Sequence, residues 1–164
     1  PALRHGLMHI REYCGCATKG SIAMMNAYAY ASSDAIACLR QAGIPVTHQR
    51  IEIARALFSA PVHLSADQIW AKVLDASPDV SRATVYNTLR LFSEKKMIRE
   101  LFVDPQRVVY DSTTTPHHHL YNMDTGEVRD IADDELRVIG EPRLPEGVVL
   151  DEIDVIVRVR NRTA

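Results

Sequence analysis

The sequence predicts an α+β protein in which a winged helix is followed by a small α/β domain. Four helix signals come in quick succession after residue 31, and two short strands separated by a turn follow them. Amphipathic strand patterns and a histidine triplet occupy the last third. Ten Lys/Arg and eight Asp/Glu lie in residues 33–107, but three Arg and eleven Asp/Glu lie in residues 124–154. This asymmetry suggests two domains with different partners, although a solvated acidic surface gives the same pattern.

The composition excludes several classes of protein. Of the 164 residues, 46% are hydrophobic and 24% are charged, which is close to a globular average. No apolar run approaches the roughly 20 residues that cross a bilayer, so a membrane protein is excluded. The three cysteines, Cys14, Cys16 and Cys38, form no C-x-x-C pair, which excludes a cysteine-only zinc ribbon. Their odd number indicates a reducing, cytoplasmic environment.

The first 31 residues show no clear periodicity and lack the apolar core of a secretory signal peptide. We expect a flexible N-terminal arm or a start-site extension here. Cys14 and Cys16 could bind a metal ion, but a disordered tail with incidental thiols is favoured because nothing nearby supplies a scaffold. The predicted domains are residues 32–112 and residues 113–164.

Caps and stops predict the first two helices. Ser32-Ser33 can cap a helix that Gly43 ends, and Thr47 can cap a second helix that ends at Pro61. In both segments the apolar residues fall on one side, as in a helix that packs against a core.

The third and fourth helices form a helix-turn-helix candidate. Ser65 and Gln68 have the spacing of a capping box, in which each side chain satisfies the other's backbone amide. Ser81 can cap the next helix, and a short turn at residues 77–79 separates the two. The fourth helix carries an inward-facing apolar stripe, formed by Val85, Leu89 and Phe92.

The opposite face of the fourth helix is polar. It carries Arg82, Tyr86, Asn87 and Arg90. The cations can contact phosphates or guanine edges, the amide can pair with adenine, and the ring can pack on a thymine methyl group. These are the properties of a recognition helix in the major groove, although an ordinary amphipathic surface helix explains this face equally well.

A predicted hairpin favours the first interpretation. Residues 98–103 and 107–111 have strand patterns, and Asp104-Pro105-Gln106 can join them as a turn. Helices followed by a two-stranded hairpin make a winged helix. DNA binding is therefore the leading function for residues 33–111.

The sequence contains three consecutive histidines, His117-His118-His119, which are candidate metal ligands. In an extended chain His117 and His119 point to one face and His118 to the other, so the first pair can reach one ion. The return strand carries Asp130. A two-residue loop at Thr125-Gly126 would place Asp130 opposite Tyr121, on the face of His119, whereas a three-residue loop would place it on the other face.

Two earlier residues add possible ligands. His63 lies in the loop before the third helix, and Asp111 ends the predicted wing. On its own, neither is better explained as a ligand than as an incidental residue. A His/Asp set suits Fe(II), Mn(II) or Zn(II) better than Ca or Mg.

Residues 153–160 alternate apolar and charged side chains and predict a final strand. With strands at residues 118–123 and 127–131 it would form a sheet too thin to stand alone, so we expect pairing with a second copy. A symmetric homodimer would also present two recognition helices to a palindromic site.

Four segments resemble the ferric uptake regulator family: Gly43–Arg50, His63–Ile69, Ser81–Leu89 and His117–Leu120. They follow the family's order over roughly four fifths of the chain. The stretch Ala83-Thr84-Val85-Tyr86, together with the histidine cluster, is fairly specific. The resemblance implies an N-terminal winged helix that binds DNA and a C-terminal α/β domain that dimerises.

The same resemblance implies a set of site residues. The family's regulatory metal site lies between the domains, and its five ligands fall here on His63, Asp111, His117, His119 and Asp130. Each position holds a competent donor. With Arg50 and Thr84 added, the expected DNA-binding residues are Arg50, Arg82, Thr84, Tyr86, Asn87 and Arg90. The implied partner is a palindromic or AT-rich operator.

Departures from the family pattern resemble one of its branches. Asn122 and Thr125 stand where the first pair of structural zinc cysteines would be, so no structural zinc site built from cysteines is expected. The helix of the C-terminal domain looks short, bounded by Asp133 and Pro142. These losses and the histidine triplet resemble the iron response regulator branch, whose members sense haem. In that branch the triplet is implicated in haem binding, which assigns this role to His117, His118 and His119.

Other functions fit the same residues. The pair Asp111 and Asp130 resembles the peroxide-sensing branch of the family, and an ordinary Fe(II)- or Mn(II)-dependent repressor would have the same ligands. A metal-dependent hydrolase or oxygenase could use two histidines and one aspartate, but it would leave the recognition helix unexplained. A DNA-binding module that has lost its sensor is a further possibility. We expect a regulator rather than an enzyme, with haem or Fe(II)/Mn(II) as its signal.

Overall fold

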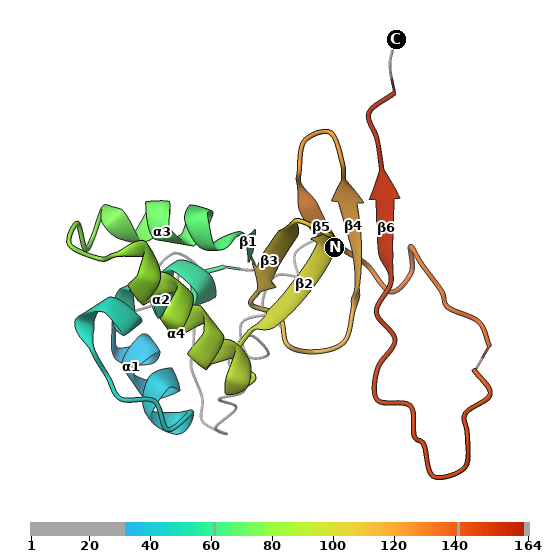
Figure 1. Cartoon of the computed structure of the whole chain (residues 1–164), viewed down its shortest axis with the longest axis horizontal. Coiled ribbons are helices and arrows are strands. Elements are labelled where there is room, and N and C mark those ends of the chain that lie inside the picture. The colour runs from blue at the N-terminus through green and yellow to red at the C-terminus, as the bar shows by residue number, and fades with distance from the viewer. Residues whose placement is uncertain (1–31, 61, 141, 163–164) are drawn as a thin grey trace, which may run out of the picture. The chain divides into compact units, whose positions relative to one another are not determined.

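The computed structural model describes residues 32–60, 62–140 and 142–162, and the chain divides into two compact units (Figure 1). The first unit ends at Thr114, and the second begins at Thr115. The arm expected at residues 1–31 and the helix end expected at Pro61 lie outside the described residues. Within the described part of the chain, no helix combines the length and the apolar character needed to cross a membrane.

Four helices build the first unit: α1 (Ser32–Gln41), α2 (His48–Phe58), α3 (Ala66–Leu74) and α4 (Arg82–Glu94). The caps predicted for the last three are confirmed. Thr47 and Ser81 have extended backbones, and each side chain accepts from the backbone N–H three residues later, at 3.3 and 3.1 Å. Ser65 and Gln68 close the predicted capping box at 3.3 and 2.8 Å.

The helices of the first unit enclose its hydrophobic core. The predicted inward stripe of α4 is confirmed, because Val85, Leu89 and Phe92 are fully buried. They belong to one cluster with buried residues of the other three helices, in which the rings of Phe58 and Phe92 lie 6.2 Å apart. This packing fixes the rotation of α4 and turns its opposite face to solvent.

Leu89→Ala tests this core. We expect a loss of about 2–5 kcal/mol in the free energy of unfolding, because the change removes buried apolar surface and leaves a cavity. Urea unfolding followed by circular dichroism measures the loss. Tyr86→Ala, on the exposed side of the same helix, is the control and should change stability by less than about 0.5 kcal/mol. Equal losses in the two variants would contradict the described orientation of α4.

A three-stranded antiparallel sheet of order β1-β3-β2 completes the first unit. β2 (Arg99–Asp104) and β3 (Arg107–Asp111) form the predicted hairpin, and β2 lies one residue later than expected. In the turn between them, Gln106 N donates to Asp104 Oδ1 at 2.8 Å.

The third strand of this sheet corrects an expectation. His63 does not lie in a loop but in β1 (His63–Leu64), which pairs with β3. The pairing sets His63 opposite Asp111. A two-residue strand is too short to show the alternation by which strands are recognised in a sequence.

The second unit is a three-stranded sheet of order β5-β4-β6. Its strands are β4 (His118–Asn122), β5 (Val128–Ile131) and β6 (Ile156–Val159). β5 runs antiparallel to β4, and β6 runs parallel to it. β6 covers only part of the strand expected at residues 153–160. Among the described residues of this unit no helix forms, and the short helix expected after Asp133 is replaced by a turn at residues 133–135.

The register of β4 and β5 corrects a second expectation. Asp130 pairs with His119 and not with Tyr121, which pairs with Val128. The loop is therefore longer than either alternative that the sequence left open, the two-residue loop at Thr125-Gly126 or a three-residue loop. Because the pairing moves by two residues, Asp130 stays on the face of His119, as the two-residue loop predicts.

A polar clamp ties the β4–β5 turn to the end of β6. Asn122 Nδ2 donates to Asn161 Oδ1 at 2.9 Å. The Asp124 carboxylate accepts from Asn161 N at 2.7 Å and from Arg160 Nη1 at 3.1 Å. Asn122 Oδ1 also accepts two backbone N–H groups of the turn. We call Asn122, Asp124, Arg160 and Asn161 the turn clamp; it holds this corner of the sheet by hydrogen bonds.

Candidate nucleic-acid interface and metal centre

The outer face of α4 presents the side chains expected of a recognition helix. Arg82, Tyr86, Asn87 and Arg90 are exposed, and Tyr86 is 49% exposed although it is aromatic. A ring beside two cations can contact a thymine methyl group while the cations contact phosphates. Within the first unit this face is therefore available to DNA.

The two arginines of this face already have partners. Arg82 lies over the Trp70 ring and 3.6 Å from Asp67, and Arg90 Nε lies 3.6 Å from Glu94 Oε1. Exposed ion pairs of this kind are weak, and a guanidinium has five N–H groups. Both arginines can therefore still bind a phosphate.

Arg50 and Thr84, also expected at the DNA, have roles inside the fold. Arg50 Nη1 donates to Pro45 O at 2.7 Å. Thr84 Oγ1 lies 2.9 Å from Ser81 Oγ, the cap of α4. Both side chains secure helix starts, so any contact with DNA comes in addition to that role.

Tyr110, on β3, is a nearby ionisable group. Burial raises the pKa of the Tyr110 phenol, and electrostatic interaction with Glu100 and Tyr86 raises it further. Tyr110 is therefore neutral at physiological pH and adds no negative charge to the surroundings of Tyr86.

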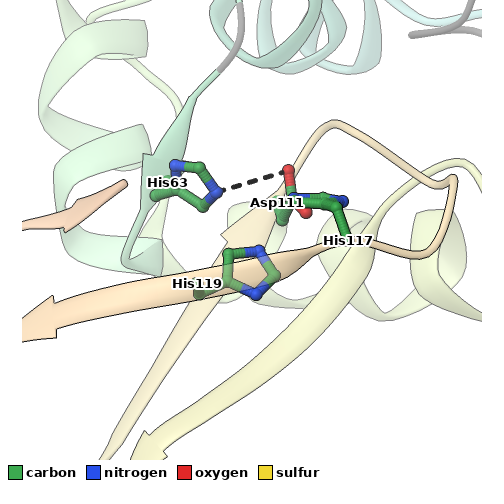
Figure 2. A group of neighbouring side chains, drawn as sticks. All are labelled: His63, Asp111, His117 and His119. Atoms are coloured by element: carbon green, nitrogen blue, oxygen red, sulfur yellow. Dashed lines mark ion pairs between the residues drawn. The ribbon is translucent and has the colours of Figure 1, made fainter. Parts of the chain in front are cut away.

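In the first unit, His63 and Asp111 form a buried pair (Figure 2). Strand pairing sets them opposite each other, with His63 Nε2 3.7 Å from Asp111 Oδ1. The carboxylate is fully buried and also accepts from Thr113 N at 2.7 Å. An imidazole beside a carboxylate offers nitrogen and oxygen donors of the kind that bind divalent transition metals.

In the second unit, His117, His119 and Asp130 face one another. His117 Nε2 lies 3.0 Å from Asp130 Oδ1, and His119 Nε2 lies 4.0 Å from the same oxygen. The two imidazole rings, both drawn in Figure 2, have centroids 4.3 Å apart. The structure thus brings together the three site residues expected in this unit.

Both ring nitrogens of His117 face oxygen atoms. Nδ1 lies 2.8 Å from Thr115 O, and Nε2 lies 3.0 Å from Asp130 Oδ1. A neutral imidazole has a single N–H and can donate to only one of these oxygens. A cation that both His117 and Asp130 bind is one arrangement that satisfies the facing nitrogen and oxygen.

Asp154 is a residue of this cluster that the sequence analysis missed. Its Oδ1 lies 3.4 Å from His119 Nδ1, just before β6. A carboxylate at this nitrogen orients the ring and directs Nε2 to the side of Asp130. The alternation of residues 153–160 places Asp154 on the polar side of a strand, but only the parallel pairing of β6 with β4 brings it to His119.

Sequence comparison decides the family. Residues 41–158 match the model of the ferric uptake regulator family, which is more than half of the chain. The chain belongs to the ferric uptake regulator family. The resemblance of the four sequence segments is thereby confirmed at the level of the family.

Individual relatives agree with this assignment. The peroxide-responsive repressor PerR of Staphylococcus aureus (strain Mu50) is 36% identical over 106 residues, which cover 65% of this chain and 72% of that protein. The ferric uptake regulator of Pseudomonas aeruginosa with manganese gives a TM-score of 0.60 at 28% identity, over 79% of this chain and 98% of that one. The Vibrio cholerae ferric uptake regulator shares the fold with a TM-score of 0.60 at 23% identity, over 76% and 98% of the two chains. The α+β fold predicted for this ferric uptake regulator family member is confirmed.

Proposed function

We propose that this member of the family regulates transcription as a homodimer that binds operator DNA through α4. Iron, as haem or as a free divalent ion, or manganese would modulate that binding at a His/Asp site. The observation that carries the sensing part is the position of His117 between two oxygen atoms. A cation bound by both residues would satisfy the nitrogen of His117 and the oxygen of Asp130, which face each other at 3.0 Å. The exposed polar face of α4 supports the DNA-binding part.

The proposed ligands of the site are His63, Asp111, His117, His119 and Asp130. The pair His63–Asp111 supports the contribution of the first unit, and the three facing donors support that of the second. Nitrogen and carboxylate oxygen donors fit Fe(II) and Mn(II). An ion that took ligands from both units would couple their positions, and in this way ion binding would reach the recognition helix.

Haem is proposed from the resemblance to the iron response regulator branch. His117, His118 and His119 supply imidazoles that can ligate haem iron. His118 and His119 are neighbours in β4, so their side chains point to opposite faces of the sheet. A contribution of His118 would therefore distinguish haem from a divalent ion, which needs only the face of His117 and His119.

A second candidate function is peroxide sensing. The carboxylates of the proposed site are both aspartates, Asp111 and Asp130, a feature that resembles the peroxide-sensing branch, and a peroxide-responsive repressor is among the relatives. Oxidation of a ligand histidine would then release DNA. A repressor that depends on Fe(II) or Mn(II) without peroxide chemistry would use the same donors.

Exposed apolar side chains in the second unit support the homodimer. Ile139 is 87% exposed and Val149 is 84% exposed, and both lie in the long connection between β5 and β6. A three-stranded sheet with such a connection has apolar surface that a second copy could cover. Two copies would present two α4 helices to a palindromic operator. Because the partner is DNA, we propose a cytoplasmic location and no enzymatic activity.

An anaerobic titration of the full chain with haem, Fe(II) and Mn(II) tests this function. Haem binding is followed by the Soret band and ion binding by calorimetry, and the affinity for a selected DNA duplex is measured at each endpoint. Saturable haem binding that changes DNA affinity supports haem sensing. Fe(II) or Mn(II) binding without specific haem uptake supports sensing of a divalent ion. A peroxide challenge then separates a peroxide sensor from a repressor that depends on Fe(II) or Mn(II) alone. A DNA affinity that none of the three ligands changes would contradict sensing.

A further inference from the structure

The contacts at the start of α4 point to a role for two residues of α3. We propose that Trp70 is a positioning residue, which holds the Arg82 guanidinium ready for a DNA phosphate, and that Asp67 is the anion which the phosphate displaces. The proposal rests on the DNA-binding part of the proposed function and adds how one of its cations is held.

Arg82 is held on two sides. Its Cζ lies 4.5 Å from the centroid of the Trp70 ring, and its Nη1 lies 3.6 Å from Asp67 Oδ1. The indole itself is fixed, because Trp70 Nε1 donates to Val80 O at 3.0 Å. Trp70 thus binds the turn before α4 by its edge and the first residue of α4 by its face.

This arrangement suits the exchange of one anion for another. A guanidinium has a flat face and an edge of N–H groups, so the face can stay on the indole while the edge binds an anion. The side chains of Arg82 and Asp67 are 60% and 57% exposed, which leaves the pair open to solvent. A DNA phosphate would therefore compete with Asp67 and not with Trp70. A guanidinium already held in place also loses less rotamer freedom when it binds.

The chain carries its own probe of this contact. Trp70 is the only tryptophan among the 164 residues. Its fluorescence therefore reports on the surroundings of Arg82 without any label.

The first measurement compares the fluorescence of full-length variants without DNA. Arg82→Met removes the guanidinium from the indole face and should change the emission of Trp70. Arg55→Met is the matched control, because it removes another guanidinium, one that pairs with Glu52 on α2. Its emission should equal that of the wild type.

The second measurement uses a duplex selected from a random-sequence library, with and without Mn(II). Trp70 emission should change with the same midpoint as duplex anisotropy. Asp67→Asn should tighten binding about two- to fivefold, which is the range expected for loss of a competing exposed ion pair. Arg82→Met should weaken binding and reduce the steepness of log affinity against log salt by about two, one for each half-site of the dimer. Arg82→Lys should restore the slope but not the emission, because lysine has the charge without the flat face.

Each result bears on a different step of the proposal. Equal emission of wild type and Arg82→Met would show that Arg82 does not lie on Trp70. An affinity that Asp67→Asn leaves unchanged or weakens would exclude competition by Asp67, and full rescue by Arg82→Lys would exclude positioning by the ring. Failure of the wild-type chain to bind any duplex would contradict the proposed DNA-binding function itself, while the emission without DNA would still test the contact.

Discussion

Tyr86→Ala is expected to abolish sequence-specific DNA binding while the fold is retained. Tyr86 is 49% exposed on the outer face of α4, opposite the buried stripe, so removal of its ring leaves the core intact. Loss of a base-edge contact costs about 1–3 kcal/mol, which corresponds to an affinity about 5- to 160-fold lower. In a symmetric dimer the loss occurs at both half-sites. Fluorescence anisotropy with a selected duplex and a scrambled duplex measures the difference.

Two further variants separate base contacts from phosphate contacts. Tyr86→Phe keeps the ring and should retain most of the affinity if the ring packs on a methyl group. Arg90→Ala should weaken binding to both duplexes alike and reduce the salt dependence, because it removes a phosphate contact. Specific binding at full strength by Tyr86→Ala would remove this residue from the interface.

The second large effect is expected from His117→Ala combined with His119→Ala. Ion or haem affinity should fall by more than about 100-fold, since the loss of two direct donors exceeds the 10- to 100-fold cost of losing an outer partner. The DNA affinity of the apo-protein should persist, because α4 belongs to the other unit. The same anaerobic titrations, run on wild type and variant, give both quantities.

Controls are needed because His119 is fully buried and its removal could unfold the second unit. His117→Ala alone removes a side chain that is 12% exposed, and it should lose ion binding with less effect on stability. His48→Ala removes an exposed imidazole at the start of α2 and should leave the titration unchanged. His118→Ala should weaken haem binding but not Fe(II) or Mn(II) binding. A double variant that titrates like the wild type would exclude these residues from the sensor.

Local chemistry explains which parts of the fold could be predicted. The cap of α4 at Ser81 and its buried stripe each depend on residues within a few positions of one another, so the sequence contains the whole signal. The pairing of His63 with Asp111 joins distant segments through a strand of two residues. No local pattern encodes such a pairing, and this is why His63 was expected in a loop.

The candidate site also has one part that the sequence predicts and one part that depends on long-range pairing. His117 and His119 share a face because side chains alternate along an extended chain, which the sequence shows directly. The place of Asp130 depends on whether the β4–β5 loop shifts the pairing by an even or an odd number of residues, which turn residues alone do not decide. Asp154 reaches His119, 35 positions away, only through a parallel strand pairing. The contact of Arg82 with the Trp70 ring likewise depends on how α3 and α4 pack against each other.

The turn clamp has a consequence for a cell that is short of zinc. Asn122 and Thr125 stand where the resemblance to the family implies structural zinc cysteines, and amide, carboxylate and guanidinium groups hold this corner of the sheet. Hydrogen bonds of this kind need no metal supply and no reduced thiol at that corner. The turn clamp therefore closes this corner without a metal ion, so the closure does not depend on the zinc concentration of the cell.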